Sequence, residues 1–213
     1  MKHDIASIEH LSDLSSFDEI VDVRSPAEFA EDHVPGSRNY PVLDDRQRCE
    51  VGTLYKQVSA FAARKVGAAY VAENIAQHLR QHFAERPRDW RPLVLCWRGG
   101  QRSASLTHVL RQVGWDAQQL AGGYRTYRRL VVAALNELPL GLRLKVVCGP
   151  TGSGKSRVLQ AIGHLGEQVL DLEEIACHKG SVLGSLPDSP QPAQKMFESR
   201  LLVALQRFDR ERP

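Results

Sequence analysis

The chain has 213 residues, of which 42% are hydrophobic and 25% are charged. This ordinary globular composition excludes a disordered, collagen-like or low-complexity protein, and the length is sufficient for one large domain or two small ones. No apolar run approaches the roughly 20 residues that a membrane-spanning helix needs. The polar start at residues 1–4 is unlike a secretory signal. We therefore expect no membrane partner.

The cysteines are scattered along the chain without the Cys-x-x-Cys spacing of many zinc sites. They are Cys49, Cys96, Cys148 and Cys177. This usage argues against a zinc site or a disulfide scaffold and fits a reducing compartment. We expect a cytoplasmic protein with no metal site among its catalytic residues.

The net charge of +3 is unevenly distributed. Residues 1–79 hold 8 basic and 13 acidic side chains, a net charge of −5, whereas residues 80–129 hold 10 arginines against 3 acidic side chains, a net charge of +7. A basic block of this kind suggests a polyanionic partner. An arginine-rich solvated surface would have the same composition, so charge alone leaves both interpretations open.

Short apolar runs alternate with segments of helical periodicity in the first part of the chain. The expected strands are residues 19–24, 91–96 and 117–120, and the expected helices start after Ser25 and span residues 60–82 and 103–113. Ser25 followed by Pro26, with Glu28 three residues after the serine, is a helix-start signature, and residues 34–37 form a turn. Strand–helix alternation predicts an α/β fold with a doubly wound, mostly parallel sheet.

A second unit is expected to follow a short linker at residues 138–141, which divides the chain into residues 1–138 and 139–213. Its expected elements are a strand at 142–148, a helix from 155 to about 165, and a strand at 169–172. Only 73 residues follow Leu140, fewer than the roughly 100–150 of a typical domain. We therefore expect the N-terminal part of a truncated α/β domain.

The first chemical motif is a cysteine loop at residues 96–103, Cys-Trp-Arg-Gly-Gly-Gln-Arg-Ser, which stands between an expected strand and an expected helix. Backbone N–H groups of such a loop form an anion cradle. The helix N-terminus, Arg98 and Arg102 would favour a thiolate at Cys96. The pattern predicts a nucleophilic cysteine that holds a charged adduct or attacks an oxyanion.

The second motif is a phosphate loop at residues 149–156, which fits G-x4-G-K-S in full. Its backbone amides would wrap phosphates, Lys155 would neutralise the terminal phosphate, and Ser156 could ligate Mg²⁺. The expected binding residues are Gly149, Gly152, Ser153, Gly154, Lys155 and Ser156. Asp171 is a candidate metal-binding aspartate, but it could equally cap a helix that begins after it.

The first part of the chain resembles a rhodanese domain. The residues that carry this resemblance are 22–29, 33–37, the cysteine loop, and Ala121-Gly122-Gly123-Tyr124. Rhodanese sulfurtransferases usually have Cys-x4-Arg, whereas this chain has Cys-x5-Arg between Cys96 and Arg102, as in the related dual-specificity phosphatases. The wider loop would hold phosphate or a chalcogen larger than sulfur. Asp22 and Arg24 are expected to form a buried structural pair.

A rhodanese domain joined to a phosphate loop resembles the bacterial tRNA 2-selenouridine synthases. Further residues that carry this resemblance are 51–57, 74–79, 171–173 and 178–181, with Lys179 where the family pattern has arginine. An exchange of arginine for lysine keeps the charge but loses bidentate phosphate binding. Members of this family continue through a fuller phosphate-loop domain.

The resemblance implies replacement of sulfur by selenium at C2 of wobble 2-thiouridine in tRNA, with selenophosphate as the selenium donor. It also implies transfer of a geranyl group from geranyl diphosphate, which gives S-geranyl-2-thiouridine as the species selenated. Cys96 would carry selenium as a perselenide, the phosphate loop would bind the diphosphate, and the arginine block, including Arg125, Arg128 and Arg129, would meet tRNA phosphates. No tightly bound cofactor is implied, apart from a possible Mg²⁺ at the phosphate loop.

Two rival functions remain open at the level of sequence. A cysteine phosphatase fused to a nucleotide-binding domain is favoured by Cys-x5-Arg and disfavoured by Leu95, where many such phosphatases have histidine, and by the lack of an obvious general acid. A rhodanese-like sulfurtransferase fused to such a domain is the related alternative. A non-catalytic docking module is the other, and the intact Cys96 loop argues against it.

Overall fold

The computed structural model describes residues 5–150, 152–180, 184–209 and 212. The chain divides into two compact units, Met1–Leu130 and Val131–Pro213.

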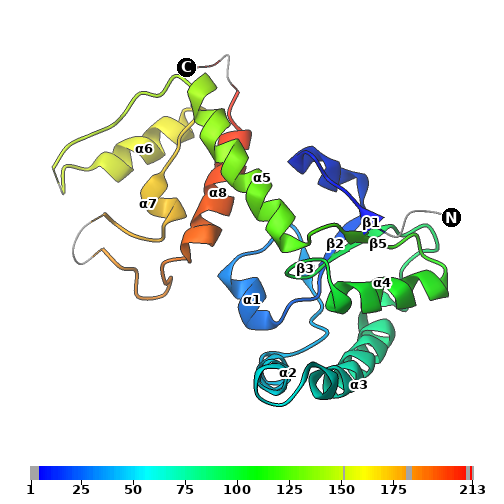
Figure 1. Ribbon diagram of the computed structural model, residues 1–213. Helices are drawn as coiled ribbons and strands as arrows, with labels where there is room; N and C mark the ends of the chain where they lie inside the picture. Colours follow the sequence, from blue (N-terminus) through cyan, green and yellow to red (C-terminus); the bar gives the residue numbers. More distant parts are fainter. Residues whose placement is uncertain (1–4, 151, 181–183, 210–211, 213) are drawn as a thin grey trace. The chain divides into compact units, whose positions relative to one another are not determined.

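The first unit is built on a parallel five-stranded sheet with the order β1-β5-β4-β2-β3 (Figure 1). The strands are β1 Ile5–Ala6, β2 Glu19–Asp22, β3 Arg38–Asn39, β4 Pro92–Leu95 and β5 Gln118–Leu120. Every strand pair is parallel, and β4 at the centre is buried along its whole length. The predicted α/β class and parallel sheet are confirmed.

Helices connect these strands, as parallel pairing requires. Their bounds are α1 Pro26–Glu31, α2 Asp45–Gln57, α3 Ala60–His78 with a π-helical continuation at Leu79–Phe83, and α4 Gln101–Val113; a 3₁₀ helix spans Leu11–Ser16. After the last strand, α5 Tyr124–Glu137 begins in the first unit and continues past its end at Leu130. The predicted start of α1 is confirmed, because the Ser25 backbone N–H donates to Glu28 Oε2 at 3.1 Å. The predicted stop of α4 is also confirmed: Gly114 takes a left-handed conformation and its N–H bonds carbonyls of the last turn.

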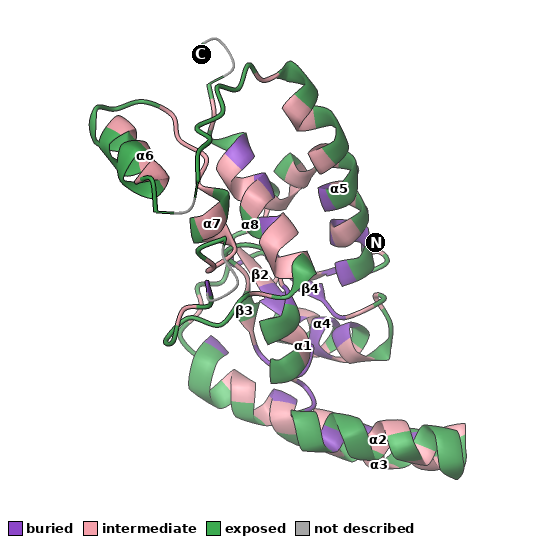
Figure 2. Cartoon of the chain, turned by 90° about the vertical axis from the view of Figure 1, so that its left-hand side faces the viewer, coloured by how far each residue is buried: buried purple, intermediate pink, exposed green. Residues whose placement is uncertain are grey.

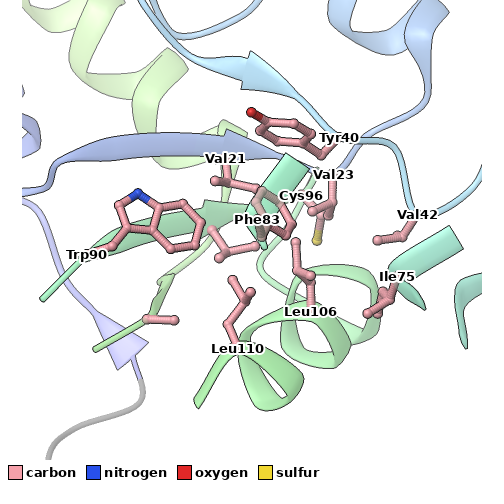
Figure 3. Packing of buried hydrophobic residues seen from close by; sticks show 12 residues of the cluster. Val21, Val23, Tyr40, Val42, Ile75, Phe83, Trp90, Cys96, Leu106 and Leu110 are labelled. Carbon is pink, nitrogen blue, oxygen red and sulfur yellow. The ribbon is translucent and has the colours of Figure 1, made fainter. Parts of the chain in front are cut away.

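One apolar core fills the space between the sheet and α3 and α4 (Figure 3). Val21 from β2, Phe83, and Leu106 and Leu110 from α4 are each fully buried there. Burial of a side chain of this size contributes roughly 1.5–3 kcal/mol. This core fixes β4 and α4, the two elements that flank the cysteine loop.

The second unit is mainly helical in its described residues. It contains a 3₁₀ turn at Leu138–Gly141, α6 Lys155–His164, α7 Leu172–Ile175 and α8 Gln194–Gln206. The predicted helix after the phosphate loop is therefore confirmed as α6. The described residues add only two isolated antiparallel bridges, at His178↔Ser185 and Leu186↔Ser189.

The predictions of strands at residues 142–148 and 169–172 are wrong. Residues 142–150 have no regular hydrogen-bonding pattern and are almost all exposed, and Asp171 already caps α7. A strand forms only where a neighbour accepts and donates its backbone hydrogen bonds. No such neighbouring strand lies among the described residues of this unit. The backbone of these two apolar segments therefore has no strand to pair with there.

Candidate active site

Cys96 follows the last residue of β4 and lies at the base of the loop that leads into α4. The residue is 3% exposed. The backbone N–H of Gly100 donates to its sulfur at 3.3 Å, and the Ser103 hydroxyl donates at 3.1 Å. The loop therefore presents two hydrogen-bond donors to one sulfur atom.

A buried amide determines which way the Ser103 hydroxyl points. Gln119 of β5 donates through Nε2 to Ser103 Oγ at 2.9 Å and to the Gly100 carbonyl at 3.2 Å. The Ser103 oxygen accepts from Gln119, so its own proton is free to be donated to a neighbour. Two acceptors are in reach, Cys96 Sγ at 3.1 Å and Gly100 O at 3.2 Å. The carbonyl already accepts from Gln119 and from the Ala104 N–H at 3.1 Å, which uses both of its lone pairs and leaves the sulfur.

Sequence reasoning assigned no role to Ser103 or Gln119. Ser103 stands next to Arg102, so its place in the motif was a usable signal. Gln119 carries no such signal, because it reaches the loop only through parallel pairing of β4 with β5, in which Val94 lies opposite Gln119.

The closing turn at residues 121–124 packs directly against the cysteine loop. The N–H of Tyr124 donates to the Cys96 carbonyl at 2.8 Å. A Cβ on Gly123 would lie 2.2 Å from that same carbonyl oxygen, and a Cβ on Gly99 would lie 2.7 Å from the Leu120 carbonyl. Both glycines have positive φ. Only glycine permits this approach of two backbone segments.

The two arginines of the loop have different environments. Arg102 forms an ion pair with Glu28 of α1, with Nη2 3.2 Å from Oε1. Burial opposes the charge of the Glu28 carboxyl, but the hydrogen bond and the charge of Arg102 outweigh it and lower the pKa of Glu28. Burial likewise opposes the charge of Arg102, yet its bond to Glu28 raises the pKa of Arg102, and the nearby Cys96 adds to the rise. Arg98 is exposed.

A buried charge network lies beside the loop. Asp22 and Arg24 are both fully buried and form the expected pair, with Arg24 Nη2 2.6 Å from Asp22 Oδ2. The Arg24 guanidinium also lies over the Tyr124 ring, 3.9 Å from its centroid. Tyr124 donates to the buried Asp32 at 2.6 Å, and Arg128 lies 3.5 Å from the same carboxylate. Burial, followed by the bond to Asp32, raises the pKa of Tyr124.

The arginines after the closing turn therefore separate into two kinds. Arg128 pairs with buried Asp32. Arg125 and Arg129 are exposed, and Arg129 donates to Thr126 Oγ1 at 3.1 Å.

In the second unit the phosphate loop precedes α6 as the motif requires. Gly152 and Gly154 have φ near +80°. The Lys155 amine donates to the carbonyls of Gly149 and Pro150 at 3.0 and 3.1 Å, which holds it against the loop that a phosphate would occupy. Ser156 Oγ lies 3.5 Å from Glu173 Oε2. Residue 151 of the loop lies outside the described residues.

Asp171 caps α7 by accepting from the Glu174 backbone N–H at 3.0 Å. The capping alternative is thus confirmed, and it is Glu173 that reaches the phosphate loop. In the segment after α7, the Lys179 N–H donates to the Gly184 carbonyl, while residue 181 lies outside the described residues.

Among the described residues, no group of three or more histidine, cysteine or acidic side chains is placed to hold a metal ion. No helix in the same part of the chain has the length and apolar character to cross a membrane.

Two family models match the chain. The rhodanese-like domain matches residues 7–130, and the tRNA 2-selenouridine synthase AAA domain matches residues 142–213.

Curated relatives match across both units. A tRNA 2-selenouridine synthase of Nitrosomonas europaea is 37% identical over 89% of this chain and 49% of its own length. One from Nitrosomonas eutropha is 36% identical over 87% of this chain and 48% of its own length. This chain thus spans about half the length of the curated relatives that it matches.

Among solved structures, the N-terminal domain of a Clostridium difficile 630 protein named for ATP/GTP binding is 30% identical, with a TM-score of 0.52. The match covers 60% of this chain and 98% of that one.

Proposed function

The chain belongs to the rhodanese-like domain family, and from that premise we propose that it carries the selenium-transferring site of a tRNA 2-selenouridine synthase. The observation that carries the proposal is the sulfur of Cys96, held by the Gly100 N–H and the Ser103 hydroxyl at the base of a wide loop. The names of relatives that match nearly the whole chain support the same reaction.

The reaction replaces sulfur by selenium at C2 of wobble 2-thiouridine. Thiocarbonyl sulfur is a poor leaving group, so the proposed first step transfers a geranyl group from geranyl diphosphate to that sulfur and releases diphosphate. The S-geranyl-2-thiouridine then has a thiolate leaving group at C2.

Selenophosphate holds selenium at the selenide level, so formation of a perselenide on Cys96 would need a two-electron acceptor. A balanced route uses Cys96 as a nucleophile instead. Its thiolate adds to C2 and geranylthiolate leaves; the selenium of selenophosphate then adds to C2 and the Cys96 thiolate leaves. Water cleaves the P–Se bond, which releases phosphate and leaves selenium on C2. The cradle, with Arg98 at its exposed side and Arg102 beside the sulfur, would balance the charge of selenophosphate.

The phosphate loop would bind the diphosphate of the geranyl donor. Lys155 would exchange its two carbonyl partners for phosphate oxygens, and the loop amides would complete the cradle. Ser156 and Glu173 offer the oxygen ligands that Mg²⁺ prefers. A Mg²⁺ held there would neutralise charge on the diphosphate.

The tRNA would be held partly by the arginine block, in which Arg98, Arg125 and Arg129 are exposed. We place the reaction in the cytoplasm, the reducing compartment that suits a free cysteine nucleophile.

The test is mass spectrometry of nucleosides from 2-thiouridine tRNA incubated with this chain. Geranyl diphosphate alone should give S-geranyl-2-thiouridine, and addition of selenophosphate should give 2-selenouridine. A covalent protein–tRNA adduct should form in the absence of selenophosphate and should be lost in Cys96→Ser. Absence of both nucleoside products would contradict the proposal.

A second candidate is a cysteine phosphatase, favoured by the Cys-x5-Arg spacing together with the Ser103 hydroxyl on the Cys96 sulfur. Such a hydroxyl would also stabilise a cysteine thiolate as the leaving group when a phosphoenzyme is hydrolysed. Hydrolysis of an aryl phosphate that disappears in Cys96→Ser would favour this candidate.

A further inference from the structure

The turn between α2 and α3 exposes large apolar side chains that neither reaction step uses. Tyr55, Val58 and Phe61 are 64%, 67% and 67% exposed. The helices pack against each other further along, where Ala63 and Gly67 of α3 are buried and a Cβ on Gly67 would lie 3.4 Å from Val51 Cγ1 of α2; in Figure 2 the two helices overlap. We call Tyr55, Lys56, Val58, Phe61, Arg64 and Lys65 the hairpin tip.

The hairpin tip is also uniformly basic. Residues 51–72 contain three basic side chains, Lys56, Arg64 and Lys65, and no acidic one, and all three are exposed. The Lys65 amine lies 5.4 Å from the centre of the Phe61 ring, which places a cation beside an exposed aromatic face. Arg64 Nε donates to the Ala60 carbonyl at 3.2 Å, which holds its guanidinium on the same first turns of α3.

Exposed aromatic rings interleaved with cations match the chemistry of unpaired RNA. Bases stack on aromatic faces, while cations beside the rings neutralise the phosphates that connect the bases. A second copy of the hairpin tip is a poor partner, because a two-fold contact would bring three positive charges against three others.

We propose that the hairpin tip binds a single-stranded part of the tRNA, with Tyr55 and Phe61 as stacking surfaces and Lys56, Arg64 and Lys65 as phosphate contacts. The inference rests on the proposed function for the identity of the RNA as tRNA. The contact chemistry itself applies to any unpaired RNA, so it is testable apart from the reaction.

The experiment measures fluorescence anisotropy of labelled oligouridylate and of tRNA titrated with the 213-residue protein. The double variant Tyr55→Ala, Phe61→Ala should lose about 25-fold or more in affinity for both RNAs, because each of the two base–aromatic stacks is worth at least about five-fold. Val58→Ala, at an equally exposed aliphatic position, is the matched control and should stay within about two-fold. Lys56→Ala, Lys65→Ala should flatten the salt dependence of oligouridylate binding by about 1.4 in log K against log salt.

Unchanged RNA affinity in the double variant would overturn the proposal. So would an equal loss in Val58→Ala together with a change of oligomeric state in light scattering, which would indicate a second copy at the tip. If the double variant lost binding to anionic lipid vesicles but kept its RNA affinity, the tip would be assigned to a membrane surface, and the proposal would also be overturned. Cys96→Ser should bind RNA normally, because the cysteine lies outside the hairpin tip. If the unaltered protein made no modified nucleoside but still showed RNA binding that depends on the tip, the proposed reaction would be contradicted and the tip proposal would stand.

Discussion

The two glycine-rich loops of this chain, the cysteine loop and the phosphate loop, differ in what holds them. The cysteine loop is supported from far along the sequence: Glu28, Gln119 and Gly123 all contact it through an assembled sheet. The phosphate loop is supported almost entirely by its neighbours, since Lys155 bonds the carbonyls of Gly149 and Pro150 and α6 starts at Lys155 itself. A glycine-rich loop before a helix can therefore take its local form without a paired strand behind it, whereas a cradle with buried side-chain donors cannot.

The largest expected effect separates the chemistry of the two motifs. Cys96→Ser should abolish formation of 2-selenouridine and leave geranylation largely intact, because only the selenation step requires the cysteine nucleophile. Nucleoside mass spectrometry with and without selenophosphate measures both. Cys49→Ser, at an exposed cysteine of α2, should leave both activities unchanged. Continued 2-selenouridine formation by the Cys96 variant would refute its role.

Loss of an apolar side chain should cost more stability in the first unit than in the second. Leu106→Ala removes a fully buried side chain of the first unit and should lower the free energy of unfolding by about 2–5 kcal/mol. Leu165→Ala in the second unit, where the leucine is 82% exposed, should change it by less than about 0.5 kcal/mol. Urea titration of both variants makes the comparison; equal losses would mean that the second unit buries more than its described residues do.

The phosphate loop should respond to loss of its lysine. Lys155→Ala should weaken binding of geranyl diphosphate, since charge-assisted hydrogen bonds are worth about 1.5–3 kcal/mol each. Calorimetric titration measures the affinity, and Lys145→Ala, outside the motif, is the control. An affinity that does not change would mean that the loop serves another ligand.

The arginines near the closing turn should separate into RNA contacts and structural groups. Replacement of Arg98, Arg125 and Arg129 by alanine should flatten the salt slope of tRNA binding by about two to three units, at roughly 0.7–0.9 for each phosphate contact. Arg128→Ala should instead lower the melting temperature and keep the slope, because it leaves the buried Asp32 short of a cation. Anisotropy titrations at several salt concentrations, run beside thermal melts, distinguish RNA contacts from structural groups. A flatter salt slope of tRNA binding in Arg128→Ala would mean that Arg128 contacts RNA.

The smallest effect concerns pH. The pKa of Glu28 is lowered in the folded protein, so its ion pair with Arg102 stabilises the fold above the ordinary glutamate pKa, and this contribution is lost as the pH falls through the lowered value. Glu28→Gln should thus cost about 1 kcal/mol near neutral pH and little in acid. Unfolding curves at several pH values test this; a cost that does not vary with pH would point to packing instead.

The elements of the first unit that were predicted have local signals, whereas β1, β3, α2 and α5 were not predicted. Ser25 and Glu28 mark a helix start, Gly114 marks a helix stop, and the apolar run before Cys96 marks the central strand. The cysteine motif likewise indicates a candidate nucleophile, Cys96, from its place between an apolar run and a glycine-rich loop. The contributions of Gln119 and Asp32 could not be predicted, since both depend on which strands and helices become neighbours in space.

In the second unit, apolar periodicity at residues 142–148 predicted a strand that the structure lacks. Periodicity reports which side chains favour burial, but a strand also depends on a hydrogen-bonding neighbour, which this stretch of sequence cannot supply. Asp171 illustrates the same limit at one residue, because a cap and a metal ligand have the same local sequence.

The close approach of Gly99 and Gly123 to neighbouring backbone has a consequence for redesign. Any side chain at either position would collide with a carbonyl or amide of the opposite segment. The backbone that underlies the cysteine loop therefore cannot be reshaped by substitution at Gly99 or Gly123. Arg98 and Gln101 are exposed, and substitutions at these two positions could change the size and charge of the ligand that the loop accepts while the backbone beneath stays constant.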